Sequence, residues 1–388
     1  MRKVKENRFM KIPKALFFVC LFFVCLFFAQ MVGNSKDMAA TQNSKNSDKR
    51  IKIGLLIQDS LSTDAIKGAE MAIQKANEGR GTMGHTFELL THSMEGSWGI
   101  GSKMAVDLIF EGNVWAILGS HDGRNAHLVE QVTAKSQIVY LSAWASDPTL
   151  SQAFVPWYFS CVPNDLEQAD LLVQEIVSKR KISKVAVVSE NGYDSDMARK
   201  CFLKKTINSG NLTPIQLIYD NSLNNFQLII DKIRQADIKG IVFYGSTPAA
   251  SKFIQQIRHL KMNQPVFCSF TFLDKSVSPE FRLGDYENVV FVSPGNWIAN
   301  KDIAFRNEFL KRYKKIPGSI AAYAFDGMNI IIDAIKNSGF DRAKLQKVLS
   351  KSQYQGITGT IRFDQRGNRM DANGLIEIHN GKLKQIEN

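Results

Sequence analysis

A run of polar residues follows an apolar stretch in the segment ILGSHDGRNA at 117–126. Its Asp122, Arg124 and Asn125 are residue types that cap a helix or hold a polar or charged ligand. The same segment also fits a solvated turn, so its composition leaves both interpretations open. The position of this loop relative to other polar loops therefore has to decide between them.

Enzyme signatures receive little support. GSWGIGSK at 96–103 resembles a phosphate-binding loop, but Lys103 stands one residue too late to reach a phosphate. No G-x-G-x-x-G follows the first predicted strand, and there is no G-x-S-x-G nucleophile elbow. We therefore expect no catalytic residues and no cofactor, although spacing alone does not exclude a Cys–His pair.

Metal-binding and disulfide patterns are also weak. The six His are dispersed, no H-E-x-x-H occurs, and His121 and His127 are poorly spaced for one helix face. We expect no metal site. Cys161, Cys201 and Cys268 follow the N-terminal region, and three thiols allow at most one disulfide.

The elements that must position the polar loops alternate between two periods. Apolar runs rich in β-branched residues, such as 51–57 and 114–120, alternate with segments such as 65–77 that have apolar residues at helical spacing. A second series of this kind begins near residue 166. We therefore expect an α/β fold with two Rossmann-like lobes, each built on a parallel sheet.

Seven polar loops follow predicted strands of the two series. In open parallel sheets, ligands bind beyond the carboxyl ends of the strands, near helix N-termini. One such loop is more often a helix cap than a ligand site, but seven of them favour a shared cleft. The loops are 58–64, 93–99, 120–125, 142–148, 190–196, 245–248 and 269–272.

The last third of the sequence departs from this alternation. Residues 301–351 are predicted to be mostly helical, and Asp326, inside one helical pattern, is expected to be structural. Strand patterns at 356–387 are interrupted by turns, one of them at Asn380-Gly381, and Asn-Gly between alternating runs is a strong hairpin signal. We expect an antiparallel meander and a C-terminal hairpin.

The first forty residues have the layout of a secretory signal. A basic segment precedes the apolar stretch at 15–29, and small and polar residues follow it. The stretch is near the lower limit for a spanning helix, so a retained anchor is an alternative. We expect 1–40 to be a signal peptide or N-terminal anchor, and the protein to be periplasmic or extracellular.

Basic residues outnumber acidic ones by 49 to 37, and seven of the basic residues belong to 1–40. The one dense basic cluster, at 311–315, is typical of a helix end, where cations stabilise the negative pole of the helix dipole. Nucleic-acid binding would need a stripe of such clusters with interleaved aromatic residues. We expect no nucleic-acid partner.

From about residue 51 onward, the sequence resembles the leucine/isoleucine/valine-binding proteins, the solute receptors of branched-chain amino acid ABC transporters. The similar segments are 117–151, where two strands end in polar loops, YAFDGMNIIIDAI at 323–335 and YQGITGTIRFDQRGNR at 354–369. Their order and spacing carry the resemblance. It implies the type I periplasmic-binding fold, whose two lobes are joined by three crossover segments and close on a small molecule like a hinge.

The resemblance also implies where the lobes divide. Crossovers are expected at 159–165, at 291–297 and near 352–358. Lobe one then comprises 49–162 plus 293–352, and lobe two comprises 163–292 plus 353–388.

Site positions of the family transfer unevenly to this sequence. Ser146 matches a hydroxyl that meets the ligand carboxylate, and Tyr193 matches the aromatic residue that covers the ligand. A second hydroxyl of the family falls at Gly123, beside Arg124. The acidic residue that binds an α-ammonium group falls near Thr271, where no carboxylate stands.

A buried ammonium without an acidic partner costs several kcal/mol. Either Asp122 or Asp194 substitutes, or the ligand is not a standard α-amino acid. In the second case Arg124 and the nearby aromatic residues, Phe270 among them, would suit a carboxylate on an apolar body. The expected ligand-binding residues are Trp98, Ser120, Asp122, Gly123, Arg124, Ser142, Trp144, Ser146, Tyr193, Ser246 and Thr271.

We therefore expect an extracytoplasmic solute-binding protein that captures an amino acid or another carboxylate-bearing solute and delivers it to the permease of an ABC transporter. A ligand-sensing receptor module without a transport role is the first alternative, and a hydrolase-like enzyme is the second. The expected partners are the small-molecule ligand and the permease. The membrane is reached only through the signal or anchor segment, and a monomer is expected.

Overall fold

The computed structural model describes residues 50–78, 83–97, 99–209, 212–222, 225–277, 279, 282–298, 303–370 and 374–386. The expected signal or anchor and Trp98 lie outside these residues. Within the described ranges, no helix combines the length and the apolar character needed to cross a membrane.

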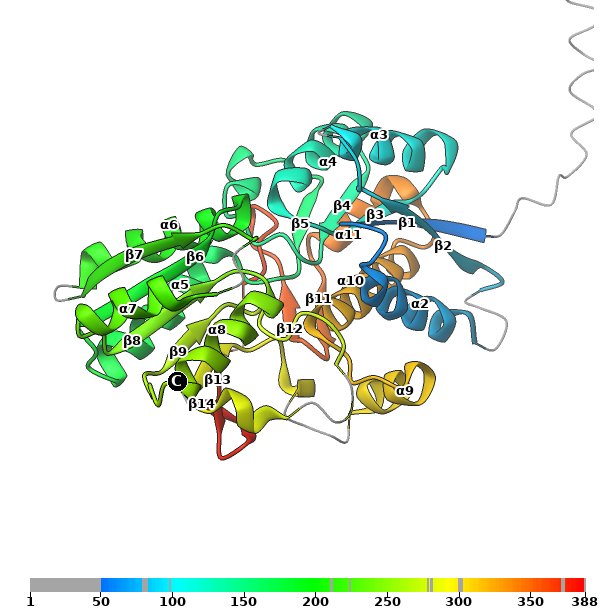
Figure 1. Cartoon of the computed structure of the whole chain (residues 1–388). Coiled ribbons are helices and arrows are strands. Elements are labelled where there is room, and N and C mark those ends of the chain that lie inside the picture. Colours follow the sequence, from blue (N-terminus) through cyan, green and yellow to red (C-terminus); the bar gives the residue numbers. More distant parts are fainter. Residues whose placement is uncertain are drawn as a thin grey trace, which may run out of the picture. The chain divides into compact units, whose positions relative to one another are not determined.

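Lobe one is built on a sheet of five parallel strands in the order β2-β1-β3-β4-β5. Two helices cover each face: α3 and α4 pack on one side, and α2 and α10 on the other (Figure 1). The strands are β1 (Arg50–Ile57), β2 (Thr86–Ser93), β3 (Ala116–Ser120), β4 (Val139–Ser142) and β5 (Tyr158–Ser160). The helices are α2 (Thr63–Asn77), α3 (Ile100–Val106), α4 (Gly123–Ser136), α10 (Ser319–Asn337) and the short α11 (Leu345–Leu349).

Lobe two is built on a seven-stranded sheet in the order β14-β13-β10-β9-β8-β6-β7. Helices α5 and α6 pack on one face and α7 and α8 on the other. The strands are β6 (Lys184–Glu190), β7 (Thr213–Tyr219), β8 (Gly240–Tyr244), β9 (Val266–Cys268), β10 (Val289–Val292), β13 (Leu375–His379) and β14 (Lys382–Ile386). The helices are α5 (Asp165–Val173), α6 (Tyr193–Thr206), α7 (Gln227–Gln235) and α8 (Thr247–His259). In this sheet β10, β9, β8, β6 and β7 run parallel, and β13 and β14 extend it in antiparallel orientation. The expected α/β fold with two lobes built on parallel strands is thus confirmed.

The C-terminal hairpin is confirmed, but the single meander is wrong. Asn380 and Gly381 both have positive φ angles, 51° and 66°, and join β13 to β14. The preceding strands, β11 (Gln353–Gly356) and β12 (Gly359–Arg362), form a separate two-stranded sheet. The separation follows from the pairing of β13 with β10 in the sheet of lobe two. Asp364 stabilises the turn after β12, because its Oδ1 accepts hydrogen bonds from two backbone N–H groups of that turn.

The basic cluster at 311–315 lies where expected. Helix α9 (Ala304–Tyr313) carries Lys311 and Arg312 in its last turn. These cations stand at the negative pole of the helix, which agrees with the structural interpretation of the cluster.

Buried polar contacts tie together the segments that connect the lobes. The Asp326 carboxylate of α10 accepts hydrogen bonds from the N–H of Ile357 (3.1 Å), the N–H of Thr358 (2.7 Å) and the hydroxyl of Thr358 (2.6 Å). Arg369 is 1% exposed and donates to the carbonyl oxygens of Cys161 (2.9 Å) and Thr358 (2.6 Å). We call these five residues the hinge cluster. The structural role expected for Asp326 is confirmed.

The third connection also meets the hinge cluster. Gly295 has a φ of 120°, and a Cβ on it would lie only 2.5 Å from the Thr358 Cα. Only glycine permits this close approach of two backbones. The three segments expected as crossovers therefore lie together.

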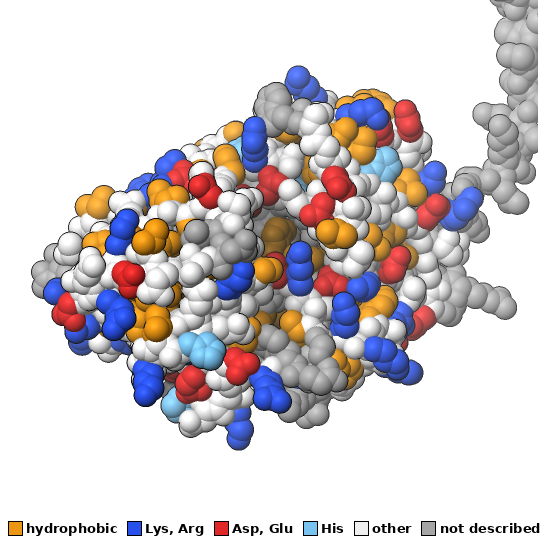
Figure 2. Space-filling model, in the orientation of Figure 1, with side chains coloured by type: hydrophobic (Ala, Val, Ile, Leu, Met, Phe, Trp, Pro, Cys, Tyr) orange, Lys and Arg blue, Asp and Glu red, His pale blue; other side chains and the backbone are white. Residues whose placement is uncertain are grey.

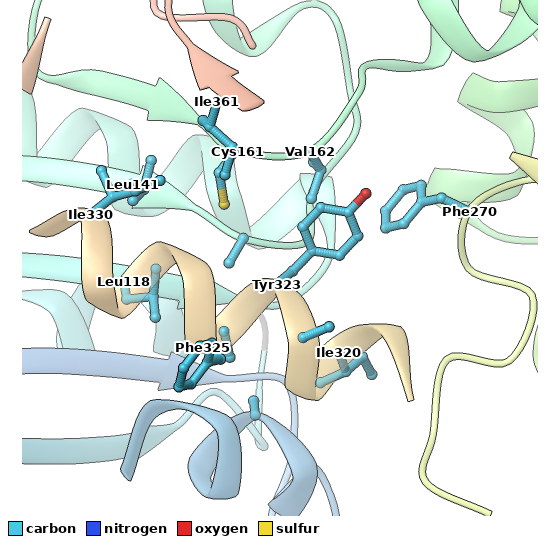
Figure 3. Packing of buried hydrophobic residues seen from close by; sticks show 14 of the residues in the cluster. Leu118, Leu141, Cys161, Val162, Phe270, Ile320, Tyr323, Phe325, Ile330 and Ile361 are labelled. Carbon is cyan, nitrogen blue, oxygen red and sulfur yellow. The ribbon is translucent and has the colours of Figure 1, made fainter. Parts of the chain in front are cut away.

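Helix α10 packs against one face of the lobe-one sheet, and its first turns contact residues of lobe two. Figure 3 shows its residues packed against Leu118 and Leu141 of the first sheet, with the Tyr323 ring beside Phe270. The centroid of the Phe270 ring lies 5.3 Å from that of Tyr323 and 5.0 Å from that of Trp144. Phe270 is fully buried, so it supports Trp144 from behind and does not line a cavity. Cys161, Cys201 and Cys268 are buried free thiols.

Candidate functional site

A cavity of about 730 Å³ lies beyond the carboxyl ends of strands from both sheets. Residues from the loops after β1, β2, β3, β4, β6, β8 and β9 line it, so all seven loops predicted from the sequence meet there. Its volume lies in the range of about 300–1,000 Å³ that is typical of small-molecule sites. Figure 2 shows this face hollowed between the two lobes, with several acidic side chains along the edge of the hollow.

The N-terminus of α4 forms the lobe-one wall. Asp122 caps the helix, because its carboxylate accepts from the backbone N–H (2.7 Å) and the side-chain amide (2.8 Å) of Asn125. The N–H of Asp122 donates to Gln58 at 2.9 Å, which links this loop to the loop after β1. Arg124 is exposed on the first turn of α4 and lines the cavity.

The two lobes touch directly across the cleft. The N–H of Gly123 donates to Asp194 of α6 at 2.9 Å, and the Tyr193 hydroxyl donates to Asp147 at 2.8 Å. A Cβ at Gly123 would lie 3.0 Å from the Asp147 Cβ and 3.3 Å from the Tyr193 ring. Gly123 therefore lets α6 approach α4, which is a physical reason for glycine at a position where the family has a hydroxyl.

Titratable groups surround the lobe-to-lobe contact. Burial tends to raise the pKa of Asp147, but hydrogen bonds from His127, Thr149 and Tyr193 outweigh it and lower the pKa to about 2. The hydrogen bond to Asp147, at 3.0 Å, raises the pKa of His127. Burial, with the charge of Asp122 nearby, raises the pKa of Asp194 to about 7. Asp194 is thus poised between its charged and neutral forms near neutral pH.

A buried acid lies at the start of α5. Asp165 is 5% exposed and lines the cavity. Its Oδ1 accepts from the Gln168 amide at 3.2 Å, and its N–H donates to the Ser146 carbonyl at 2.8 Å. Burial raises the pKa of Asp165 well above its usual range, although a hydrogen bond with the Ser146 side chain opposes this shift.

The lobe-two wall combines hydroxyls with a second acid. Glu190, at the end of β6, accepts from the N–H of Ser246 at 2.9 Å. The Ser269 and Thr271 hydroxyl oxygens are 2.6 Å apart and both residues line the cavity. This wall therefore offers hydrogen-bonding groups from three different loops.

Most of the predicted site residues line the cavity, and the structure brings them together from both lobes. Ser120 and Ser142 are buried at the ends of β3 and β4, and Gly123 lies beneath Tyr193 and Asp194. Trp98 falls outside the described residues. The predicted residues that line the cavity are Asp122, Arg124, Trp144, Ser146, Tyr193, Ser246 and Thr271.

Several acids that line the cavity were given no role by sequence reasoning. Glu190 and Glu95 lie in two of the predicted polar loops, so their positions after strands could have identified them as cleft residues. Asp165 is the last residue of an expected crossover, and its sequence context indicates the start of a helix. Asp274 lies beyond the predicted loop after β9. In the described ranges, no group of three or more His, Cys, Asp or Glu side chains is placed to hold a metal ion.

The chain belongs to the periplasmic binding protein family, whose model matches residues 50–376. Among curated proteins it is similar to "Leu/Ile/Val-binding protein homolog 3" of Brucella melitensis, with 23% identity over 330 residues, 83% of this chain and 88% of that protein. The resemblance seen in the sequence is thereby confirmed. Relatives in this family are solute-binding proteins, and the family implies an extracytoplasmic location.

Solved structures share the fold at low sequence identity. The branched-chain amino acid transporter substrate binding protein LivJ from Streptococcus pneumoniae, in complex with isoleucine, has a TM-score of 0.72 and 20% identity, covering 86% of this chain and 98% of its own. A solute binding protein from Rhodopseudomonas palustris, in complex with 3,4-dihydroxybenzoic acid, has a TM-score of 0.73 and 16% identity, covering 88% and 96%. The same fold thus holds chemically different solutes.

Proposed function

We propose that this chain is an extracytoplasmic solute-binding protein that captures a small solute, an amino acid or another carboxylate-bearing molecule, between two hinged lobes. It then delivers the solute to the permease of an ABC transporter. The convergence of seven strand-end loops from both lobes on one cavity carries this proposal. In this function the protein catalyses no reaction, and specificity comes from polar groups that both lobes supply.

We infer that the hinge cluster is the fixed point of the motion. Asp326 and Arg369 bind backbone groups of the connecting segments, so those segments stay together while the lobes move. The contacts of Gly123 with Asp194 and of Tyr193 with Asp147 form only when the lobes approach. A ligand that touches both walls would favour that approach, because it binds the closed arrangement better than the open one.

We infer further that the ligand contacts the predicted residues on the cavity wall. Ser146 and Arg124 offer hydrogen-bond donors from lobe one, and Tyr193 covers the cleft from lobe two. Residues 1–40 act as a signal peptide or anchor, and the protein works as a monomer.

Native mass spectrometry of the purified chain, together with chemical identification of any bound solute, tests solute capture. We expect one small molecule per chain, recovered unchanged after denaturation. Recovery of a chemically altered molecule, or failure of every tested solute to bind, would contradict the proposal.

Transport is tested separately by deleting the gene and measuring uptake of the identified solute. We expect uptake to fall and to return when the gene is restored. Unchanged uptake with intact binding would favour a sensing module that is not coupled to transport.

A further inference from the structure

The cleft has a charge opposite to that of the chain. Among the described residues, seven Asp or Glu side chains line it against one cationic side chain, Arg124, whereas the whole chain has 49 basic and 37 acidic residues. Lobe one contributes Asp59, Glu95 and Asp122 to this set, which we call the cleft carboxylates. The other members are Asp165, Glu190, Asp194 and Asp274.

Two lobe-one members have local structural roles. Asp59 accepts from the N–H of Leu61 (3.0 Å) and the hydroxyl of Ser62 (2.8 Å) in its own turn. Asp122 caps α4. Local hydrogen bonds therefore account for these two acids without a ligand.

Three of the four lobe-two members receive only neutral donors from the described residues. Asp165 binds the Gln168 amide, Glu190 the N–H of Ser246, and Asp194 the N–H of Gly123. Among the residues that the structure describes, none of the three forms an ion pair with Lys or Arg. Asp165 is 95% buried as well, and burial without a cation disfavours its ionised form. A cation that enters the cleft would stabilise the ionised form and form an ion pair with it.

The N-terminus of α4, which would best bind an anion, already binds two acidic side chains of the chain itself. The first N–H groups of a helix attract negative charge. Here the N–H of Gly123 binds Asp194 and the N–H of Asn125 binds Asp122. A ligand carboxylate would have to displace Asp194 and lie beside Asp122, at an energetic cost from like-charge repulsion.

We propose that the solute held in this cleft is a small organic cation, whose ammonium or guanidinium group binds between Asp165, Glu190 and Asp194. The inference rests on the proposed function, solute capture in this cleft. Trp144 and Tyr193 supply aromatic surface for the stem of such a ligand and for cation–π contact. Arg124 can bind one carboxylate, so basic amino acids and simple amines share the recognised chemistry.

A ligand panel on the full chain tests this proposal by calorimetry. The panel pairs lysine with norleucine, which lacks the side-chain ammonium, and lysine with cadaverine, which lacks the carboxylate; arginine, agmatine, leucine and benzoate complete it. We expect a cation to bind about tenfold or more tightly than its neutral counterpart. Binding of norleucine, leucine or benzoate as tight as that of every cation would overturn the proposal.

The two ways of failing are distinguishable. If the tightest-binding panel member or the co-purifying solute is neutral or anionic, solute capture still stands. Only the proposal that the solute is a cation is then overturned. Absence of binding by every panel member and of any co-purifying solute would remove the proposed function and this inference with it.

Charge-neutral variants test the role of the acids. Asp165→Asn and Glu190→Gln keep the side-chain shape, and each is expected to weaken binding of the preferred cation about tenfold or more. Asp170→Asn is the control, because it removes an exposed acid, paired with Lys205, from the same helix as Asp165. Unchanged cation affinity in both cleft variants would overturn the proposal, and two acids at separate loops keep the test valid if one variant misfolds.

Discussion

The hinge cluster and the cleft both bury acidic side chains, but among the described residues a cation lies close to Asp326 and none lies close to Asp165. Asp326 accepts three hydrogen bonds, and Arg369 lies close enough for its positive charge to stabilise the ionised form. Burial still raises the pKa of Asp326 to about 6. Asp165 in the cleft has no such cation among the described residues, and its pKa is raised well above the usual range.

In the function that we propose, this difference separates a joint from a binding site. Where the lobes are connected, the chain satisfies its own buried polar groups, which would fix the geometry there. In the cleft, the acids receive only neutral donors, so a bound ligand would change the balance between the open and closed forms that we propose.

The largest expected effect is the loss of the hinge cation. Arg369→Met removes the positive charge near Asp326 and the donors to several buried carbonyl oxygens, and we expect the free energy of unfolding to fall by about 3–5 kcal/mol in urea denaturation. Arg366→Met, three residues away and exposed, is the control and should change it by less than about 0.5 kcal/mol. A loss below about 1 kcal/mol for Arg369→Met would mean that the hinge cluster is not held by its charges.

A methyl group at the lobe contact should affect closure. Gly123→Ala crowds Asp147 and Tyr193, and overpacking of this kind costs about 1–3 kcal/mol, which we expect to appear as weaker ligand affinity in calorimetry. Gly284→Ala is the matched control, since a Cβ there meets no atom within 4 Å and Gly284 is not among the described residues that line the cleft. Equal affinities for the two variants would show that the lobes need not approach as closely as in this structure.

The stability of the free protein should depend on pH through Asp194. Because its pKa is raised to about 7, ionisation disfavours the folded state above that pH, and stability rises as pH falls from 7 toward the ordinary value of an aspartate. We expect urea denaturation to show a gain between about pH 8 and pH 5, of which Asp194→Asn removes about 1–2 kcal/mol. Asp196→Asn on the exposed face of α6 should leave the gain unchanged. An identical pH profile in Asp194→Asn would place the titrating group elsewhere.

The smallest expected effect concerns the second lobe contact. Tyr193→Phe removes the hydrogen bond to Asp147, worth about 0.5–1.5 kcal/mol, so ligand affinity should fall roughly threefold to tenfold. Tyr313→Phe, at the end of α9, is the control. Unchanged affinity in Tyr193→Phe would show that the ring alone covers the cleft.

The α/β fold and the convergence of the seven loops could be predicted, because hydrophobic periodicity is local and the carboxyl ends of parallel strands meet at one edge. The separation of β11 and β12 from the C-terminal hairpin could not, since β13 pairs with β10, a strand much earlier in the chain. The burial of Phe270 behind Trp144 was missed for the same reason: a polar loop signal does not show which of its side chains turns inward.

By itself, the sequence determined the order of elements, the family resemblance, the hairpin at Asn380-Gly381 and the loops that meet at the cleft. Only the tertiary structure decided that Gly123 donates to Asp194, and that Asp165 faces the cavity with no cation from the described residues beside it. The charge around a side chain depends on residues from other elements that fold against it. For this reason, a loop whose sequence suggested a binding site for a ligand carboxylate lies in a cleft that is lined mainly by acidic residues.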